Sequence, residues 1–307
     1  MKQAIAYYEQ ALDICKARGD RPGEGHVLNG LGRVYNVQGP REQALEYFEQ
    51  ALAICKEVGK PQLEGRTLSN LGLIHTDLGN YAEALEYSKQ SLVIRKNMGD
   101  RRGEGVAIDN LGRVYSELGQ YERAVKHFKE ALSIYQAIGD RGLEGWAFHN
   151  LGWTYNRMGQ YEQARQFLAQ ALRIHQEVGN RRGENRTTRD LGKSSSMLGQ
   201  QNQALEYYKQ ALIISQEIQD PFGEASILQN AALVYTNQAR YDLALSCLLV
   251  AKRIFDELHS PYSHDTQDQI DTIQEKIGVE QFTALLAKVE TQAQQIVDQA
   301  LLYIHGK

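Results

Sequence analysis

Apolar residues recur at three- and four-residue steps along most of the chain, which is the spacing of one face of an α-helix. In the segment 102–118 the residues Ala107, Leu111, Val114, Tyr115 and Leu118 follow this spacing. In the segment 121–138 the spacing is followed by Tyr121, Ala124, Val125, Phe128, Ala131, Leu132 and Tyr135. The pattern predicts two amphipathic helices over these segments, and an equivalent pair at every multiple of 40 residues.

The repeat of 40 residues is regular and contains no insertion. A Leu-Gly pair marks five copies and Ala231-Ala232 marks a sixth: Leu31-Gly32, Leu71-Gly72, Leu111-Gly112, Leu151-Gly152 and Leu191-Gly192. Two further series of glycines follow the predicted helix ends, at positions 19, 59, 99, 139 and 179 and at positions 39, 79, 119, 159 and 199. A glycine in this place takes the left-handed conformation that closes a helix. The two series therefore predict two helices in each repeat.

Two small residues interrupt the apolar faces of the predicted pair. Gly112 and Ala124 occupy positions where large side chains would be expected. Small residues allow two helix backbones to approach closely. We therefore expect the two helices of a repeat to cross here, with Tyr115 and Phe128 filling the space around the crossing.

These residues resemble the signature of tetratricopeptide repeats: Leu-Gly, a tyrosine three residues later, then Ala, an aromatic residue and another Ala in the second helix. The resemblance covers residues 1–258 and implies an all-α fold, a right-handed α-solenoid of helix-turn-helix repeats. The period and the Gly-Asp-Arg-x-x-Glu-Gly linkers, as in residues 99–105, depart from the common form of about 34 residues. They resemble the longer repeats of Pins/LGN-type polarity adaptors, kinesin light chains and bacterial signalling proteins.

The repeat divides the chain into three parts. Residues 1–20 match only a second helix, residues 21–258 hold six hairpins, and residues 259–307 leave the repeat pattern. The unpartnered first segment predicts either a longer natural protein or a half-repeat that acts as a cap. After Pro261, three helical segments are predicted near 264–277, 279–289 and 292–304. This acidic tail is interpreted as a solubilising cap, with an autoinhibitory segment that folds into the groove as the alternative.

Composition narrows the function classes. A formal net charge of -4 does not indicate a nucleic-acid surface. No stretch approaches the roughly 18 apolar residues of a membrane helix, and no signal sequence is present, so a cytoplasmic protein is predicted. Three scattered cysteines, at 15, 55 and 247, argue against a disulfide framework. Without a phosphate-binding glycine loop, a metal-ligand spacing or a nucleophile motif, we predict no enzyme activity, no cofactor and no metal.

In the fold that the resemblance implies, the first helices line a concave groove. The residue before the Leu-Gly position is an asparagine in four repeats: Asn70, Asn110, Asn150 and Asn230. An amide side chain donates and accepts, so it can pair with a peptide backbone whatever the peptide's side chains. The resemblance to polarity adaptors and kinesin light chains implies that this ladder holds an extended peptide. The alternative is that the asparagines bond to the neighbouring helix and only support the stack.

Neighbouring positions of the first helices supply the specificity of the predicted groove. They bring cations and aromatic rings: Arg33, Arg66, Arg113, Trp146, His149, Trp153, Arg186, Arg189 and Lys193. Trp146 and Trp153 predict an apolar anchor pocket, with ordinary packing as the alternative. Arg186, Arg189 and Lys193 suit carboxylates, although a solvated face partly neutralised by Asp190 would show the same pattern. Together they predict a ligand with a large apolar residue followed by acidic ones.

Three hypotheses for function follow. The first is a scaffold for protein interactions that binds an extended peptide in the groove. The second is a sensor or regulatory module of a larger signalling protein, and the third is a solenoid that self-associates through its open N-terminal helix. The lysines of the carboxylate clamp of chaperone-binding tetratricopeptide proteins are absent, so we do not predict binding of chaperone tails. The serines at 194–196 replace packing residues and predict a flexible joint.

Overall fold

The computed structural model describes residues 2–38 and 40–302, and within them every regular element is helical. The predicted pair over 102–118 and 121–138 is confirmed by the sixth and seventh helices, and the all-α fold is confirmed throughout the described residues. In chain order the elements are α1 (Lys2–Arg18), α2 (Arg21–Gln38), α3 (Arg41–Glu57), α4 (Pro61–Asp77), α5 (Tyr81–Asn97), α6 (Arg101–Glu117), α7 (Tyr121–Ile138), α8 (Arg141–Arg157), α9 (Tyr161–Glu177), α10 (Arg181–Met197), α11 (Gln201–Glu217), α12 (Pro221–Asn237), α13 (Tyr241–Glu257), α14 (Tyr262–Ile277), α15 (Val279–Val289), α16 (Ala293–Val297) and the π-helical segment η1 (Asp298–Leu302).

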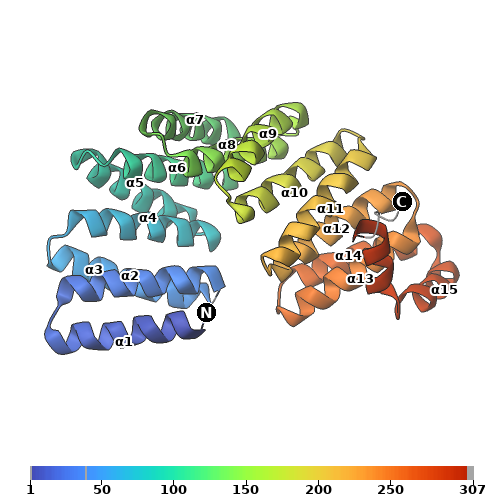
Figure 1. Cartoon of the computed structure of the whole chain (residues 1–307), viewed down its shortest axis with the longest axis horizontal. Helices are drawn as coiled ribbons and strands as arrows, with labels where there is room; N and C mark the ends of the chain where they lie inside the picture. The colour runs from blue at the N-terminus through green and yellow to red at the C-terminus, as the bar shows by residue number, and fades with distance from the viewer. Residues whose placement is uncertain (1, 39, 303–307) are drawn as a thin grey trace. The chain divides into compact units, whose positions relative to one another are not determined.

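The chain forms two compact units, residues 1–150 and 151–307. In the first unit, α2 packs on α3, α4 on α5 and α6 on α7, and each hairpin contacts the next (Figure 1). In the second unit, α10 and α11 form one hairpin and α12 and α13 form the next. Antiparallel helices joined by short turns, stacked in sequence order, are the architecture of an α-solenoid.

Glycines end the helices as the sequence predicts. Nine of the ten glycines in the two predicted series have positive φ angles, between 63° and 79°, and the tenth, Gly39, lies outside the described residues. Where the series lack glycine, Gln219, Ala239 and His259 keep positive φ angles of 54°, 57° and 50°. The turn geometry is therefore conserved along the chain even where the residue type is not, because the next helix must pack at the same angle.

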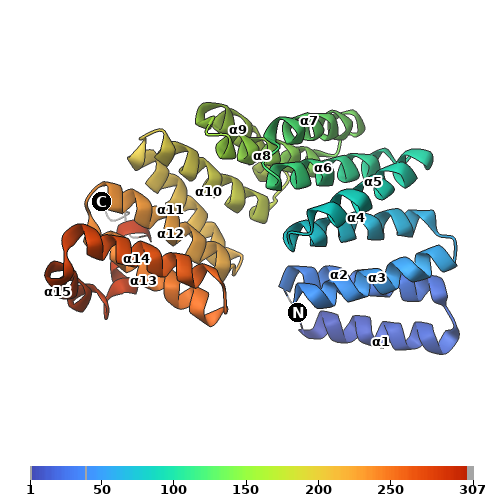
Figure 2. The same cartoon turned by 180° about the vertical axis from the view of Figure 1, so that it is seen from behind.

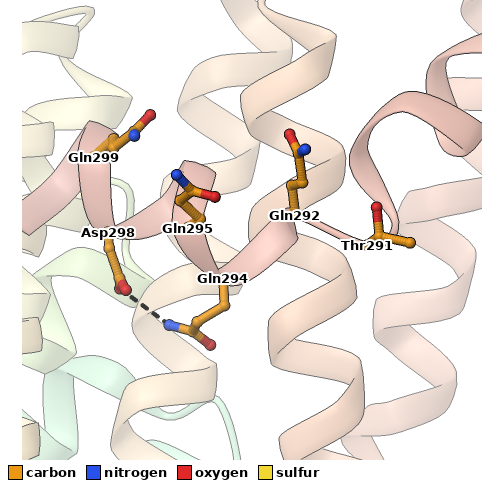
Figure 3. A pocket seen from close by; sticks show the side chains of 6 residues that line it. All are labelled: Thr291, Gln292, Gln294, Gln295, Asp298 and Gln299. Atoms are coloured by element: carbon orange, nitrogen blue, oxygen red, sulfur yellow. Dashed lines mark hydrogen bonds between the residues drawn. The ribbon is translucent and has the colours of Figure 1, made fainter.

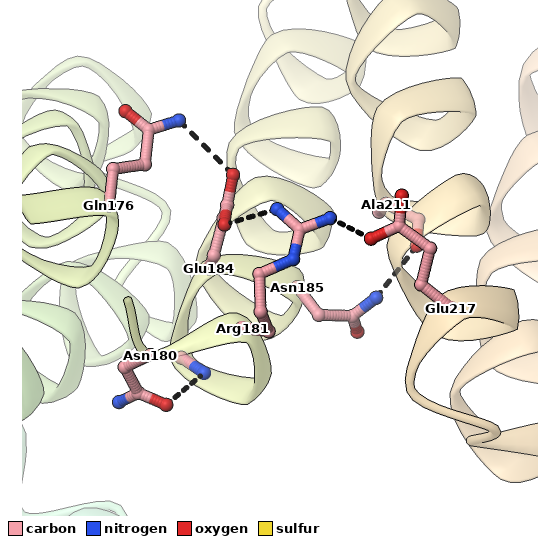
Figure 4. A network of polar contacts seen from close by, with 8 residues as sticks. Gln176, Asn180, Arg181, Glu184, Asn185, Ala211 and Glu217 are labelled. Carbon is pink, nitrogen blue, oxygen red and sulfur yellow. Dashed lines mark hydrogen bonds and ion pairs between the residues drawn. The ribbon is translucent and has the colours of Figure 1, made fainter. Parts of the chain in front are cut away.

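The Gly-Asp-Arg-x-x-Glu-Gly linkers start the first helices. The side chain of Asp100 caps α6 by accepting the Gly103 backbone N–H at 2.9 Å. Arg181 bonds to Glu184 at 2.6 Å and also reaches Glu217 of α11 (Figure 4). A side-chain oxygen at this place satisfies a backbone N–H that has no partner within the helix. The linker therefore joins the start of a first helix to its own second helix.

Small residues set the distance between the helices of a hairpin. The repeat alanines of the second helices have no exposed surface: Ala44, Ala84, Ala124, Ala164, Ala204 and Ala244. Opposite them, a Cβ atom at Gly112 would lie 2.7 Å from Cε1 of Phe128, closer than non-bonded carbon atoms approach. The predicted crossing at Gly112 and Ala124 is confirmed by this burial and this close approach.

Ring pairs recur beside the crossing. Tyr35 stacks on Tyr47, His75 on Tyr87 and Tyr155 on Phe167, with ring centroids 5.2–5.3 Å apart. Ser195 takes the first position of this pair in α10, and its fully buried Oγ has no hydrogen-bond partner within the described residues. The series of stacked rings is therefore interrupted in α10.

The first helix is less covered than its repeat equivalents. Ile14 of α1 is 53% exposed, whereas Ile54 and Ile134 at the same repeat position are each 5% exposed. In the interior copies a first helix of the same hairpin shields this position, as Leu28 of α2 packs with Ile54. The unpartnered first segment predicts poor cover for Ile5, Tyr8 and Leu12, but these three side chains are half-buried, and Ile14 is the exposed apolar residue.

The C-terminal segment packs on the last hairpins of the second unit. α14 and α16 contact α13, and η1 contacts α11 (Figure 2). Ile270, Val289 and Val297 join the core cluster of α11–α13. The helical segment predicted near 292–304 consists, over its described residues, of α16, which ends at Val297, and the π-helical segment η1. The wider π-helical turn keeps Leu301 buried beside Val297.

Candidate functional site

The first helices of successive hairpins contact one another within each unit. α4 packs on both α2 and α6, and α10 packs on α12. Among the described residues, the second helices α3, α5 and α7 have no comparable contact with each other. The first helices therefore lie on the inner side of each stack. We call the surface that these helices present, on the side away from the second helices, the inner face.

The asparagines of the predicted ladder lie on the first helices, and three of the four reach back to the preceding repeat. The Nδ2 atom of Asn70 donates to Oδ1 of Asn29 at 2.9 Å, and that of Asn110 donates to the backbone oxygen of Ser69 at 3.0 Å. Asn230 instead bonds to Ser226 O in its own helix at 2.7 Å. These bonds match the supporting role that the sequence left as an alternative, and contact with a ligand stays a prediction.

The first repeat carries glycine in place of the asparagine. Gly30 stands at the ladder position, and a Cβ atom there would lie 2.5 Å from Cε1 of Tyr8. In this structure the Tyr8 ring of α1 therefore occupies the space that a side chain at position 30 would need.

Asn150 ends the series with a charged acceptor. Its Nδ2 atom donates to both carboxylate oxygens of Asp109, at 3.1 Å each. Burial raises the pKa of Asp109 to about 6, although the Asn150 amide, Arg113 and His149 act to lower it. The sequence did not mark Asp109 as a site residue; its only signal was a charge where the earlier repeats have Asn29 and Ser69.

The predicted arginines of the first unit differ in exposure. Arg33 and Arg66 are exposed on α2 and α4, while Arg113 is half-buried and its Nη2 lies 3.3 Å from Oδ1 of Asp77. Arg113 therefore bridges two repeats, and Arg33 and Arg66 present their charge to solvent.

The two tryptophans have different neighbours. Trp146 is half-buried in the first unit and meets the ring of His149 edge-on, with centroids 5.5 Å apart. Trp153 is half-buried in the second unit, where the guanidinium of Arg157 lies 4.9 Å from its ring centroid. Both rings keep exposed surface.

The cations of α10 lie on the inner face of the second unit. Arg186 and Lys193 are exposed, and the half-buried Arg189 lies 3.6 Å from Asp190 through its Nε atom. Leu233 of the adjacent α12 is 46% exposed. This part of the inner face therefore combines positive charge with apolar surface.

Behind this face, α10 is filled with polar side chains. Ser194 donates to Oδ1 of Asn156 at 2.7 Å, and Asn156 donates to the Asp190 backbone oxygen at 3.2 Å. Asn185 donates to the Ala211 backbone oxygen at 2.7 Å (Figure 4). Hydrogen bonds therefore replace much of the apolar packing of the other repeats, and the flexible joint stays a prediction.

A shallow hollow lies near the C-terminal end of the second unit, on α16 and η1. It is lined by Thr291, Gln292, Gln294, Gln295, Asp298 and Gln299, with Gln294 donating to Asp298 at 3.1 Å (Figure 3). These are mostly exposed amides, without an aromatic anchor. Across residues 2–38 and 40–302, no group of three His, Cys, Asp or Glu side chains is placed to hold a metal ion. The candidate site is therefore the inner face.

The family model described as "Tetratricopeptide repeat" matches residues 1–57, 63–137, 124–177 and 143–217. These segments cover more than half of the chain, so the chain belongs to the tetratricopeptide repeat family. No curated protein sequence matches it. Within the described residues, none of the helices has the length and apolar character needed to span a membrane.

Solved structures share the fold at low sequence identity. Aspartyl phosphate phosphatase F from Bacillus subtilis matches with a TM-score of 0.67 and 19% identity, over 96% of this chain and 77% of that chain. A Rap protein complexed with competence and sporulation factor matches with a TM-score of 0.64 and 13% identity, over 95% and 86%. A STAND signal transduction ATPase with a tetratricopeptide repeat sensor, from Pyrococcus horikoshii, matches with a TM-score of 0.63 and 18% identity, over 91% and 45%.

Proposed function

We propose that this chain is a protein-interaction scaffold that holds an extended partner segment on the inner face. The observation that carries the proposal is the packing of first helix on first helix, which sets the side chains of successive repeats in one row. Tetratricopeptide arrays generally act as interaction modules. The Rap protein of similar fold, solved in complex with competence and sporulation factor, supports a binding role.

In the second unit, the chemistry of the inner face favours an acidic segment with an apolar residue. Arg186 and Lys193 are exposed and carry positive charge, and they can bind carboxylates of a partner. The exposed part of Leu233 and the half-buried Trp153 offer apolar surface to a large side chain. Electrostatic attraction of this kind mainly raises the association rate and the specificity.

A selection from a phage library of random 12-residue peptides tests this proposal. The library is selected on the wild-type chain and then on the double variant Arg186→Glu with Lys193→Glu. The matched control is Arg173→Glu with Lys209→Glu, which makes the same change of charge on the second helices α9 and α11.

We expect the wild-type chain to enrich acidic peptides, the control to retain them and the inner-face variant to lose them. Circular dichroism of all three proteins checks that the fold is intact. A failure to enrich any peptide, or equal binding by both double variants, would overturn the proposal.

A second candidate is self-association through α1. It rests on Ile14, which is 53% exposed although four of its repeat equivalents, Ile54, Ile134, Ile174 and Ile214, are buried. Apolar surface of this kind is stabilised by covering it with another chain. Light scattering after gel filtration tests the idea: a mass above that of one chain, which Ile14→Glu returns to that of one chain, is the expected result. A single-chain mass at all concentrations would contradict it.

The likeness to the sensor of the STAND ATPase favours a further form of the same proposal, in which the scaffold serves as the sensor of a signalling protein. Binding on the inner face is then the input signal. Co-purification of the natural gene product with an effector domain would support this form, and an isolated repeat protein would contradict it.

A further inference from the structure

One inter-repeat bond is built three times in the first unit, and its acceptor changes. Asn70, Asn110 and Asn150 each donate to the residue 41 positions earlier, which is Asn29, Ser69 and Asp109 in turn. The first two acceptors are a neutral amide and a backbone carbonyl oxygen. A neutral acceptor is therefore sufficient for this inter-repeat hydrogen bond, and the bond does not require the charge of Asp109.

Asp109 makes no ion pair among the described residues. Arg113 stands four residues further along α6, a spacing that commonly pairs an acid with a base on one helix face. Its Nη2 instead lies 3.3 Å from Asp77 of the preceding repeat, so Arg113 and His149 act on the Asp109 charge only through longer-range attraction. A carboxylate that is partly removed from water without an ion pair is costly, and such groups cluster at functional sites.

Asp109 is accessible where its neutral counterparts are not. Asn29 is 4% exposed and Ser69 is 6% exposed, whereas Asp109 is only half-buried. The carboxylate accepts only the Asn150 amide, and its two oxygens have capacity for further donors.

An aromatic ring stands one helical turn before Asn150. Trp146 precedes it by four residues on α8, so the two side chains share a helix face. Trp146 keeps exposed surface and is held edge-on by His149 at 5.5 Å between ring centroids. Asn150 thus links the two groups, because it contacts the Asp109 carboxylate and shares a helix face with Trp146. A guanidinium group can bond to an acid while it stacks on an aromatic ring.

We propose that Asp109, with Asn150 and Trp146, forms a subsite for a cationic side chain of the bound partner segment, arginine in preference to lysine. This inference rests on the proposed function of the inner face and adds the identity of one recognised residue. Asp109 supplies the charge, Asn150 fixes the orientation of the carboxylate, and Trp146 provides the stacking surface. All three residues belong to the first unit.

The test uses the random 12-residue phage library on three proteins: the wild-type chain, Asp109→Asn and Asp13→Asn. Asp109→Asn keeps an oxygen that can accept from Asn150, as Asn29 does for Asn70, so the stack is preserved. Asp13→Asn makes the same chemical change at an exposed position of α1. The highest-ranking arginine-containing peptide is then synthesised with arginine and with its neutral isostere citrulline, and both affinities are measured by calorimetry.

We expect arginine to be enriched at one position by the wild-type chain and by Asp13→Asn, and not by Asp109→Asn. Replacing arginine with citrulline is expected to weaken binding to the wild-type chain about tenfold and to leave binding to Asp109→Asn unchanged. Peptides that bind without an arginine preference, or a citrulline effect that is equal in both proteins, would overturn the subsite and leave the proposed scaffold function intact. A library that yields no binder at all would overturn both.

Discussion

The side-chain amide of Asn150 crosses a repeat boundary and donates to both carboxylate oxygens of Asp109, at 3.1 Å each. The same bond is made to neutral acceptors at Asn29 and at the Ser69 backbone. A structural bond that tolerates an amide, a carbonyl or a carboxylate leaves the chain free to vary the acceptor. The acceptor position can therefore carry recognition chemistry while the stack stays the same.

The raised pKa of Asp109 predicts a stability that depends on pH. In the folded chain the pKa is about 6, against about 3.9 for an unfolded aspartate, so the folded state binds more protons between these values. The contribution of this group to the free energy of unfolding therefore falls as pH rises from about 4 to about 6 and is constant above that range. Relative to Asp109→Asn, the free energy of unfolding of the wild-type chain is expected to fall by on the order of 1–2 kcal/mol between pH 4 and pH 6, after allowance for solvent screening.

Urea unfolding of both proteins at a series of pH values between 4 and 7 measures this difference. Arg113 and His149 act on residue 109 and are present in both proteins, so their own titration largely cancels in the difference. A difference that does not vary with pH, or that favours the wild-type chain as pH rises, would contradict the prediction.

The close approach of Gly112 to Phe128 predicts that Gly112→Ala destabilises the first unit by about 1–3 kcal/mol. The added methyl group would lie 2.7 Å from Cε1 of Phe128, so the ring or the helix must move. The control is Gly142→Ala in α8, where the nearest atom is Oδ1 of Asp140 at 3.5 Å. There the methyl group is expected to stabilise the helix by about 0.5–1 kcal/mol. Thermal unfolding of both variants decides the matter, and equal shifts in Tm would exclude the close-packing account.

Most of the fold follows from residue spacing. The Leu-Gly pairs and the glycine series locate the helices because helix packing and helix termination each require one residue type at one place. The stretch after Val289 was less predictable, because Val297 and Leu301 have the same spacing in an α-helix and in the π-helical turn that the chain adopts. A hydrophobic pattern does not distinguish these two.

The candidate site followed less directly from the sequence. The position of Asn150 on the inner face was predictable from the repeat phase, but its bond to Asp109 was not, since the two residues lie 41 positions apart. A spacing of one repeat plus one residue predicts a contact only when the displacement of each first helix along the preceding first helix is known. For the same reason, the close approach of Tyr8 to Gly30 could not be predicted from the sequence.

Two adjacent serines of α10 are expected to respond to alanine in opposite ways. Both are fully buried, but Ser194 donates to Asn156 at 2.7 Å whereas Oγ of Ser195 has no partner within the described residues. Ser194→Ala would leave a buried amide oxygen unsatisfied and cost about 1–2 kcal/mol, while Ser195→Ala would remove an unsatisfied hydroxyl and be neutral or stabilising by about 1 kcal/mol. Urea unfolding curves test this, and a loss of stability in Ser195→Ala would show that its hydroxyl has a partner.

The turn at Ala239 offers a stabilising substitution. Ala239 has a φ angle of 57°, a left-handed conformation that costs a residue with a Cβ atom about 1–2 kcal/mol and costs glycine little. Ala239→Gly is therefore expected to raise the free energy of unfolding by about 1 kcal/mol, reduced somewhat by the greater entropy of glycine in the unfolded chain. The reciprocal control is Gly199→Ala, one repeat earlier, where φ is 75° and no atom lies within 4 Å of the added methyl group. Because that site is open, any loss of stability there comes from backbone strain alone, and the two substitutions should shift Tm by similar amounts in opposite directions. A wild-type chain more stable than Ala239→Gly, together with a Gly199→Ala variant more stable than the wild-type chain, would show that backbone strain at the helix end does not explain the glycines of the repeat.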